Sequence, residues 1–444
     1  MAKRPILILH GWSGKAEHLD KISAILKKVG FNVVDIWLSD YLSMNDEITI
    51  MDLGQAMGKA IKENNIPEKR QSFDVIVHST GGLVVRQYLI HYFFGEPEKC
   101  PIKHLVMLAP ANFGSPLAHI GKSMVGRLRS GWKWEHFFQT GTRVLNALEL
   151  ASPLSWDMAK QDLFNPKNKI FYPDNLYTTV LVGSDAYSGL GRIIHENGSD
   201  GTVRVSTANL NASYIKLIFK IPKGYEVEEV KQSYESMAFG VLYGYNHGTI
   251  IRPEEDDKYF LDILVKSLTL EENEVYKEHI KYLNGITEET FKKGQVDPDK
   301  EKQKRYHQYQ HLVARIHDQF GEGIKDYFLE FFQNEGDSKD TVMQKVQSEI
   351  LEKVHNYSGD ESYRSFLFDI TDMNTEILDK GKTVDMSLCA AALSKRIYYH
   401  NPKHDYITVV SQKDKTLLKP NTTLFLDVEL PRIQSRDVFK LKKA

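Results

Sequence analysis

The sequence contains only two cysteines in 444 residues, Cys100 and Cys389, and they lie far apart in the chain. A structural disulfide is therefore not expected, and a reducing compartment is the simpler prediction. The chain also lacks an excess of charge of either sign, because its formal net charge is −2. A chain this close to neutrality argues against a nucleic-acid binder that works by bulk electrostatics.

Long hydrophobic runs are absent too: no stretch approaches the roughly 20 apolar residues needed to span a bilayer. The N-terminal "MAKRPILILHGW" is too short in its apolar part for a signal peptide, and it has no small-residue cleavage site. We therefore expect a cytoplasmic protein without a cleavable leader, with leaderless export left open. The overall composition is that of a globular protein, and its length predicts two domains.

The first half of the chain alternates between short apolar runs and helical patterns. The apolar runs are "PILILH" (5–10), "FNVVDIW" (31–37), "DVIVHS" (74–79), "KHLVMLAP" (103–110) and "YTTVLVGS" (177–184). Such β-branched runs are typical of parallel strands buried on both faces, and helices between them indicate a doubly wound α/β domain.

This rhythm changes at two places further along. Residues 112–170 have a mostly helical pattern with crowded aromatics, which predicts an inserted helical cap. The charged "VDPDKEKQKR" (296–305) favours a domain boundary. We therefore predict an α/β domain at 1–270, a charged helical connection at 271–305 and a second domain at 306–444. Strand patterns such as "SYRSFLFDIT" and "TTLFLDVELP" predict an all-β, sandwich-like second domain.

Ser79 is the candidate nucleophile. It follows an apolar strand and precedes Thr80, two glycines and an apolar helix, in "VIVHSTGGLVVRQYL". On a tight strand-to-helix turn, a serine hydroxyl projects above the sheet and close to the helix N-terminus. The first glycine of the G-x-S-x-G pattern is replaced by Val77, so a branched side chain must fit beneath this turn.

A serine nucleophile also needs a base and an oxyanion site. His10-Gly11-Trp12 ends the first apolar run, so we expect the backbone N–H groups of Trp12 and Thr80 to form the oxyanion hole. The expected base is His247, in the loop-like "YGYNHGTII", because in this fold the histidine follows the serine and the acid. His78, His195 and His10 are weaker candidates.

Two aspartates are candidates for the acid that orients the histidine. Asp200 is favoured, since it lies in "ENGSDGTVRVSTANL", a glycine-flanked turn expected to lead into another strand. Asp185, the alternative acid, directly follows the "YTTVLVGS" strand.

With these segments in order, residues 1 to about 270 resemble the α/β-hydrolase lipases, a bacterial type with an HSTGG turn. The segments that carry the resemblance are "LHGWSG", "VIVHSTGGLVVRQYL", "MLAPANFGSPLA", "GSDGTVRVSTANL" and "YNHGTII". The resemblance implies Trp12 and Thr80 in the oxyanion hole, Asp200 as acid and His247 as base. Some members bind calcium through an aspartate after the histidine; Gly248 stands there, so no metal is expected.

The predicted function is a cofactor-independent lipase or esterase, with phospholipase activity open. Four aromatic side chains of the cap are candidates for contact with an acyl chain or a membrane surface, and packing of the cap onto the core is an equal alternative; they are Trp132, Trp134, Phe137 and Phe138. The same triad also suits an acyltransferase or a thioesterase, and a non-catalytic lipid-binding scaffold is a further alternative. No nucleic-acid partner is expected, and the sequence leaves the oligomeric state open.

Overall fold

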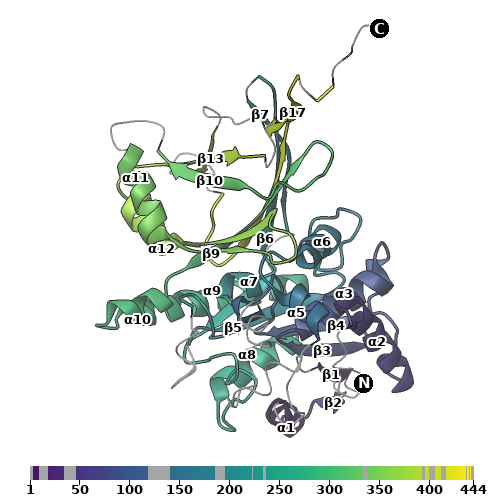
Figure 1. The fold of residues 1–444 in the computed structure, drawn as a ribbon. Coiled ribbons are helices and arrows are strands. Elements are labelled where there is room, and N and C mark those ends of the chain that lie inside the picture. Colours follow the sequence, from purple (N-terminus) through teal and green to yellow (C-terminus); the bar gives the residue numbers. More distant parts are fainter. Residues whose placement is uncertain are drawn as a thin grey trace, which may run out of the picture. The chain divides into compact units, whose positions relative to one another are not determined.

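The protein is described by a computed structural model (Figure 1). The residues that it describes are 4–9, 19–34, 47–118, 141–185, 196–222, 224–233, 237–333, 339–392, 396–399, 406–411, 417–436, 438–439 and 441. The chain forms two compact units, each built from two separate stretches. Unit 1 comprises Met1–Asn211 and Ser233–Tyr306, and unit 2 comprises Ala212–Gln232 and His307–Ala444. Across the described ranges, no helix has the length and apolarity to cross a membrane.

Unit 1 is built on a parallel six-stranded sheet. Its strands are β1 (Pro5–Leu9), β2 (Asn32–Val34), β3 (Phe73–His78), β4 (Ile102–Leu108), β5 (Tyr177–Gly183) and β8 (Ala238–Leu242), in the spatial order β2-β1-β3-β4-β5-β8. Every residue of β3, β4, β5 and β8 is buried. This burial on both faces explains why these strands read as continuous apolar runs.

Helices surround this sheet, as the alternating sequence pattern predicts. They are α1 (Asp20–Lys28), α2 (Ile50–Glu63), α3 (Gly81–Phe93), η3 (Pro97–Lys99), α5 (Thr142–Leu148), α6 (Pro153–Asp162), α7 (Val205–Ala208), α8 (Lys258–Leu268), α9 (Asn273–Gln295) and α10 (Lys300–Arg305). Side chains of α1, α8 and α9 share one hydrophobic core with the sheet, and α2 packs against α3. The predicted α/β architecture is therefore confirmed.

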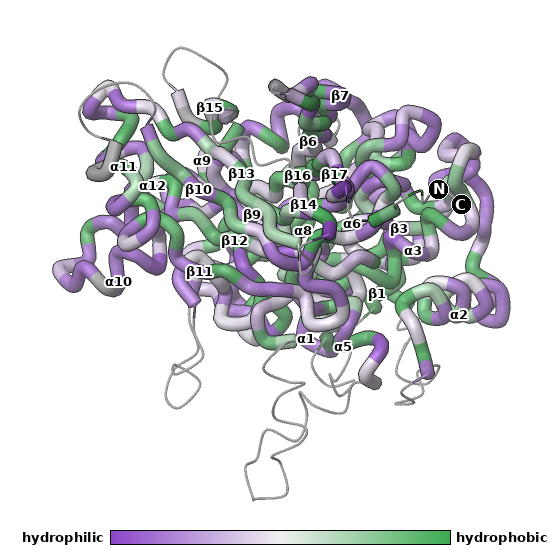
Figure 2. Tube along the Cα trace, turned by 45° about the horizontal axis from the view of Figure 1, so that its top comes forward, coloured by the Kyte–Doolittle hydropathy of each residue, from purple (hydrophilic) through white to green (hydrophobic). Residues whose placement is uncertain are grey.

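Two local predictions in unit 1 differ from the structure. The range 271–305 is not a connection between domains, because α9 and α10 belong to unit 1. Tyr276 and Leu283 of α9 are 2% and 0% exposed and lie in the core; only α10 is hydrophilic throughout, as Figure 2 shows. The strand expected after Asp200 is also absent there, since α7 occupies residues 205–208 and the next strand begins at Ala212.

His279 fixes α9 to neighbouring elements of unit 1. Its Nε2 lies 3.2 Å from Ser267 Oγ on α8 and 3.4 Å from Thr179 Oγ1 on β5. Burial lowers the pKa of His279 from 6.5 to about 4, and the positive charge of Lys266 acts in the same direction. The folded protein therefore keeps this imidazole neutral under conditions in which the unfolded chain protonates it.

We expect His279 to make the protein less stable in mild acid. Above pH 6.5, His279 is neutral in both the folded and the unfolded protein. Between pH 6.5 and about 4, only the unfolded chain binds a proton at His279. The free energy of unfolding therefore falls as the pH drops through this range. The loss over the whole window is up to about 3 kcal/mol. Urea unfolding at pH 7 and pH 5 measures it, and His279→Gln should have a smaller pH dependence than wild type. The exposed His91→Gln is the control; equal pH dependence in all three proteins would contradict the prediction.

Unit 2 contains one large sheet and one smaller sheet. The large sheet is ordered β11-β12-β9-β16-β6-β7 and the smaller one β10-β13-β15. The strands are β6 (Ala212–Phe219), β7 (Tyr225–Gln232), β9 (Tyr309–Asp318), β10 (Tyr327–Phe332), β11 (Leu351–Asn356), β12 (Tyr363–Asp369), β13 (Val384–Ala390), β15 (Ile407–Val410) and β16 (Thr423–Leu430), with β14 (Ile397–Tyr399) and β17 (Arg432–Gln434) forming a separate pair.

The two sheets of unit 2 share one hydrophobic core. Alternate residues of β9, such as Leu312 and Ile316, and of β10, such as Leu329 and Phe331, contribute to the same cluster. This arrangement agrees with the predicted sandwich, with additions. Short helical segments accompany the strands: α11 (Lys339–Lys345), η5 (Val346–Ile350), α12 (Ile370–Met373) and η6 (Asn374–Leu378).

The second unit does not begin where the sequence predicts. A boundary near residue 306 assigns 212–232 to the α/β domain, whereas β6 and β7 are strands of the large sheet of unit 2. β6 pairs in parallel with β16, more than 200 residues later in the chain, from Ala212↔Thr423 to Ile218↔Glu429. Because such pairing is determined by distant residues, local sequence patterns do not reveal it.

Candidate active site

Ser79 lies on a strained turn between β3 and α3. Its φ angle is +54°, a left-handed conformation that is uncommon for residues other than glycine. The turn is anchored by backbone hydrogen bonds, since the Ser79 N–H donates to the Leu108 carbonyl at 3.1 Å and its carbonyl accepts from Gly82 and Ala111. Strain of this kind persists only where the surrounding structure enforces it, and it is concentrated at functional sites.

The two glycines after Thr80 make this turn possible. A Cβ on Gly82 would lie 2.7 Å from Pro110 Cβ, and one on Gly81 would lie 3.1 Å from Val77 Cβ. Val77 is fully buried, and the branched side chain that replaces the first glycine of the pattern fits because Gly81 has no side chain. Thr80 is buried at the N-cap of α3, where backbone N–H groups lack helical partners.

His247 connects the serine to an aspartate. Its Nε2 lies 3.1 Å from Ser79 Oγ, and its Nδ1 lies 2.9 Å from Asp200 Oδ2. An ionised carboxylate can accept hydrogen bonds but cannot donate them. The proton between the two groups therefore lies on His247 Nδ1, and Nε2 presents a lone pair to the serine hydroxyl. In this tautomer the imidazole can remove the proton from Ser79.

The loop that carries His247 is held from several sides. The Asp200 carbonyl accepts the His247 N–H at 3.0 Å, and His78 Nε2 lies 3.1 Å from the His247 carbonyl. Gly183, at the end of β5, allows the loop to pass closely, because a Cβ there would lie 2.1 Å from the Tyr245 carbonyl oxygen. Asn246 Oδ1 closes the loop by accepting the N–H groups of Gly248 and Thr249.

Asp200 is fully buried in a turn that satisfies its other oxygen. Oδ1 accepts the backbone N–H groups of Thr202 at 2.9 Å and Val203 at 2.7 Å. Hydrogen bonds from backbone amides to a carboxylate are charge-assisted, so they hold Asp200 in the orientation in which Oδ2 faces His247 Nδ1. Gly201, with φ of +92°, supplies the left-handed residue of the turn.

Asp185, the alternative acid, has a different set of partners. Its Oδ1 accepts from the Tyr306 hydroxyl at 3.0 Å and the Gly244 N–H at 3.3 Å, and its own N–H donates to the Tyr245 carbonyl. Burial, together with the nearby charge of Asp185, raises the pKa of Tyr306, so this hydroxyl stays a donor. Asp185 therefore binds the beginning of the histidine loop, while the bond to the imidazole comes from Asp200.

A buried ion pair that joins α3 to α6 was not anticipated from the sequence. Arg86 of α3 bonds to both oxygens of Asp162 on α6, at 2.8 and 3.0 Å, and donates to the Asn112 carbonyl at 2.8 Å. Arg86 and Asp162 are both fully buried. Burial raises the pKa of Asp162, although Arg86 acts in the opposite direction. An arginine within an apolar helix was the available signal, because such a charge is almost never buried without a partner.

We expect Arg86→Met to destabilise the protein by about 3–5 kcal/mol, because it leaves the Asp162 carboxylate buried without its partner. Urea unfolding at pH 7 measures the change in free energy. The double variant Arg86→Met/Asp162→Leu should recover most of it, since both charges are then removed. Exposed Arg70→Met is the matched control; an Arg86→Met protein as stable as this control would refute the expectation.

Several predicted site residues lie outside the described residues. These are the oxyanion-loop residue Trp12, the rival histidines His10 and His195, and the cap aromatics Trp132, Trp134, Phe137 and Phe138. Of the predicted insertion at 112–170, the described part includes α5 and α6. The segment after β4 is tied to the turn that contains Asp200, since Ser115 Oγ donates to the Thr202 carbonyl at 2.6 Å.

Comparison with solved structures finds proteins of similar fold. No family model and no curated protein matches the chain. Phospholipase PlaB from Legionella pneumophila is similar over 99% of this chain and 96% of that chain, with 26% identity and a TM-score of 0.81, and 0.80 in its complex with thio-NAD. The mature lipase BlEst2 from Bacillus licheniformis aligns with 61% of this chain and 93% of that chain, with 16% identity and a TM-score of 0.39.

The similarity to PlaB extends over both units, since almost the whole of each chain is aligned. The parallel sheet of unit 1 and the serine turn after β3 are the features that α/β-hydrolases have in common. The chain has the α/β-hydrolase fold, followed by a second unit rich in antiparallel strands.

Proposed function

We propose that the chain cleaves lipid esters through Ser79, His247 and Asp200. The chain is an enzyme of the carboxylic ester hydrolase class, and the single observation that best supports this mechanism is the hydrogen bond from Ser79 Oγ to His247 Nε2. His247 accepts the hydroxyl proton while Oγ attacks the ester carbonyl carbon. The imidazolium then donates that proton to the departing alcohol, leaving an acyl group on Ser79.

Water completes the reaction by the same steps. His247 takes a proton from water, the resulting hydroxide attacks the acyl carbonyl, and Ser79 Oγ leaves with the proton. Asp200 keeps the imidazole oriented and stabilises its positive charge. The negative oxygen of each tetrahedral intermediate is bound by the backbone N–H of Thr80, at the start of α3, and by that of Trp12. This chemistry requires no cofactor.

Phospholipids are the proposed substrates. PlaB, which is similar over nearly the full length of both chains, is a phospholipase. The predicted cap adds Trp132, Trp134, Phe137 and Phe138, whose amphipathic or apolar rings suit contact with acyl chains at a lipid surface. The proposal therefore includes peripheral contact with membranes during turnover.

A substrate panel tests this function. The wild-type protein is incubated with p-nitrophenyl esters of short and long acyl chains, triglyceride emulsions and phosphatidylcholine or phosphatidylglycerol vesicles, and released fatty acid is measured. We expect hydrolysis of long-chain esters and release from phospholipid vesicles. Hydrolysis of short soluble esters without release from any vesicle would retain the triad chemistry and overturn the lipid substrate.

A further inference from the structure

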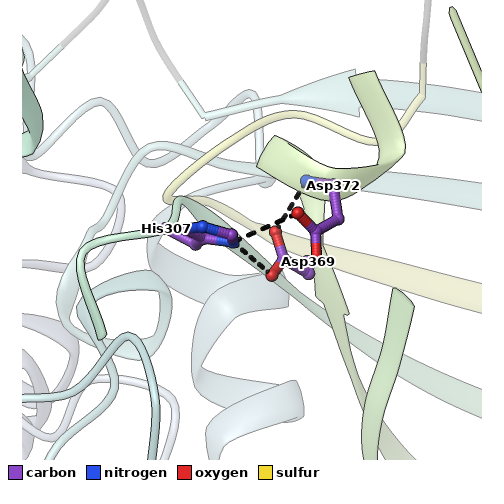
Figure 3. Close-up of side chains that lie close together, drawn as sticks. All are labelled: His307, Asp369 and Asp372. Carbon is purple, nitrogen blue, oxygen red and sulfur yellow. Dashed lines mark hydrogen bonds and ion pairs between the residues drawn. The ribbon is translucent and has the colours of Figure 1, made fainter. Parts of the chain in front are cut away.

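We propose that His307, Asp369 and Asp372 in unit 2 bind a divalent transition-metal ion. His307 Nδ1 lies 2.7 Å from Asp369 Oδ2 and 3.5 Å from Asp372 Oδ1. One ligand atom from each residue lies within 4.8 Å of the other two, and the three side chains converge as Figure 3 shows. This site is separate from the ester-cleaving residues, which all belong to unit 1.

The three side chains are held by regular structure. His307 lies two residues before the start of β9, and Asp369 is the last residue of β12, whose partner on β9 is Tyr309. Asp372 follows on α12, and its backbone N–H donates to Asp369 Oδ1 at 3.0 Å. The three ligands therefore come from paired strands and the helix that continues one of them. A site on such elements is preorganised and loses little entropy on binding.

Backbone bonds reinforce this arrangement next to the ligands. The Ile370 N–H donates to the Gln308 carbonyl at 2.8 Å, and the Gln308 N–H donates to Thr371 Oγ1 at 2.9 Å. Each of these residues is adjacent in sequence to one of the ligands. The spacing between the histidine and the two carboxylates is thus fixed by the fold.

Charge also favours a cation at this position. Asp369 is fully buried, His307 is 9% exposed, and the Asp372 side chain is 24% exposed. Two carboxylates approach one imidazole nitrogen, and Asp369 also accepts a hydrogen bond from the Tyr309 hydroxyl. Lys345 lies close enough to affect Asp372, yet its ammonium group is bonded to Glu376. A divalent ion would balance both carboxylates with His307 neutral.

The donor set indicates which ion fits. One imidazole nitrogen with two carboxylate oxygens suits Zn²⁺, Mn²⁺ or Fe²⁺ better than Ca²⁺, which takes six to eight oxygen ligands. Tetrahedral Zn²⁺ separates its nitrogen and oxygen ligands by about 3.4 Å. The 3.5 Å between His307 Nδ1 and Asp372 Oδ1 matches this distance. The 2.7 Å between His307 Nδ1 and Asp369 Oδ2 would widen by less than an ångström on binding.

Metal binding is measured directly on the full-length protein. Protein stripped with chelator is titrated with Zn²⁺ or Mn²⁺ in competition with a chromogenic indicator, and the metal content of protein purified without chelator is determined by mass spectrometry. We expect one ion per chain and an increase in melting temperature with the added ion. Ca²⁺ at equal concentration should have no comparable effect.

Matched variants identify the ligands. Asp372→Asn changes a partly exposed residue, so it should fold, and it should weaken binding at least about tenfold; His307→Gln should abolish it. His355→Gln and exposed Asp379→Asn, in the same unit, should bind as wild type does. Absence of stoichiometric binding in the wild type, or undiminished binding in both ligand variants, would overturn the site. Neither result depends on ester hydrolysis, so the proposed function is tested separately.

Discussion

Replacing Ser79 with alanine is expected to lower kcat for ester hydrolysis by about 10⁴-fold or more. The variant retains the His247–Asp200 pair and the turn but has no oxygen to form the acyl intermediate. Alanine has the same steric limits as serine at a φ of +54°, so little loss of stability is expected. Initial rates on p-nitrophenyl esters and phospholipid vesicles measure the effect.

Two controls make this result specific. Ser348→Ala removes an exposed hydroxyl from unit 2 and should leave kcat unchanged. A fluorophosphonate probe should label the wild type and Ser348→Ala but not Ser79→Ala, with circular dichroism confirming that each protein is folded. A folded Ser79→Ala protein that retains activity within tenfold of wild type would exclude Ser79 as the nucleophile.

Replacing Asp200 with asparagine is expected to lower kcat by about 10⁴-fold. The asparagine carbonyl can still accept the amides of Thr202 and Val203, so the turn should survive. Its NH₂ group would then face His247 Nδ1 and donate to it, which moves the remaining imidazole proton to Nε2. The nitrogen nearest Ser79 would then carry a proton and could no longer accept one.

Asp185→Asn is the matched comparison for the acid. This variant disturbs the bonds to Tyr306 and Gly244 while the Asp200–His247 bond remains, so we expect a loss of roughly tenfold or less from a displaced loop. Steady-state kcat and KM on one long-chain p-nitrophenyl ester compare the two variants. A larger loss in Asp185→Asn than in Asp200→Asn would assign the acid to Asp185.

Much of unit 1 could be predicted from local sequence. Continuous apolar runs mark β1, β3, β4 and β5 because strands buried on both faces need no polar alternation. The strained turn at Ser79 also has a local cause, since glycines must follow it where Pro110 and Val77 approach closely. The apolar runs and the paired glycines are therefore visible in the chain itself, although the contact between Gly82 and Pro110 joins residues that are distant in sequence.

The features that could not be predicted depend on residues that lie far apart in the sequence. Whether Asp200 or Asp185 bonds to the imidazole depends on where the histidine loop lies relative to β5, and sequence spacing does not determine that position. The Arg86–Asp162 pair joins residues 76 positions apart, and His307 meets Asp369 across 62 positions. Interactions of this kind arise only once the strands and helices have been assembled.

The chain passes between its two units three times, after residues 211, 232 and 306. Deleting 306–444 would therefore not release a finished enzyme, because β6 would lose its parallel neighbour β16 and expose an unpaired strand edge prone to aggregation. A chimera that exchanges the accessory part with that of a relative must graft the 212–232 hairpin and the C-terminal segment as one matched set. In such experiments a graft of either segment alone would leave one of these two strands without its native neighbour.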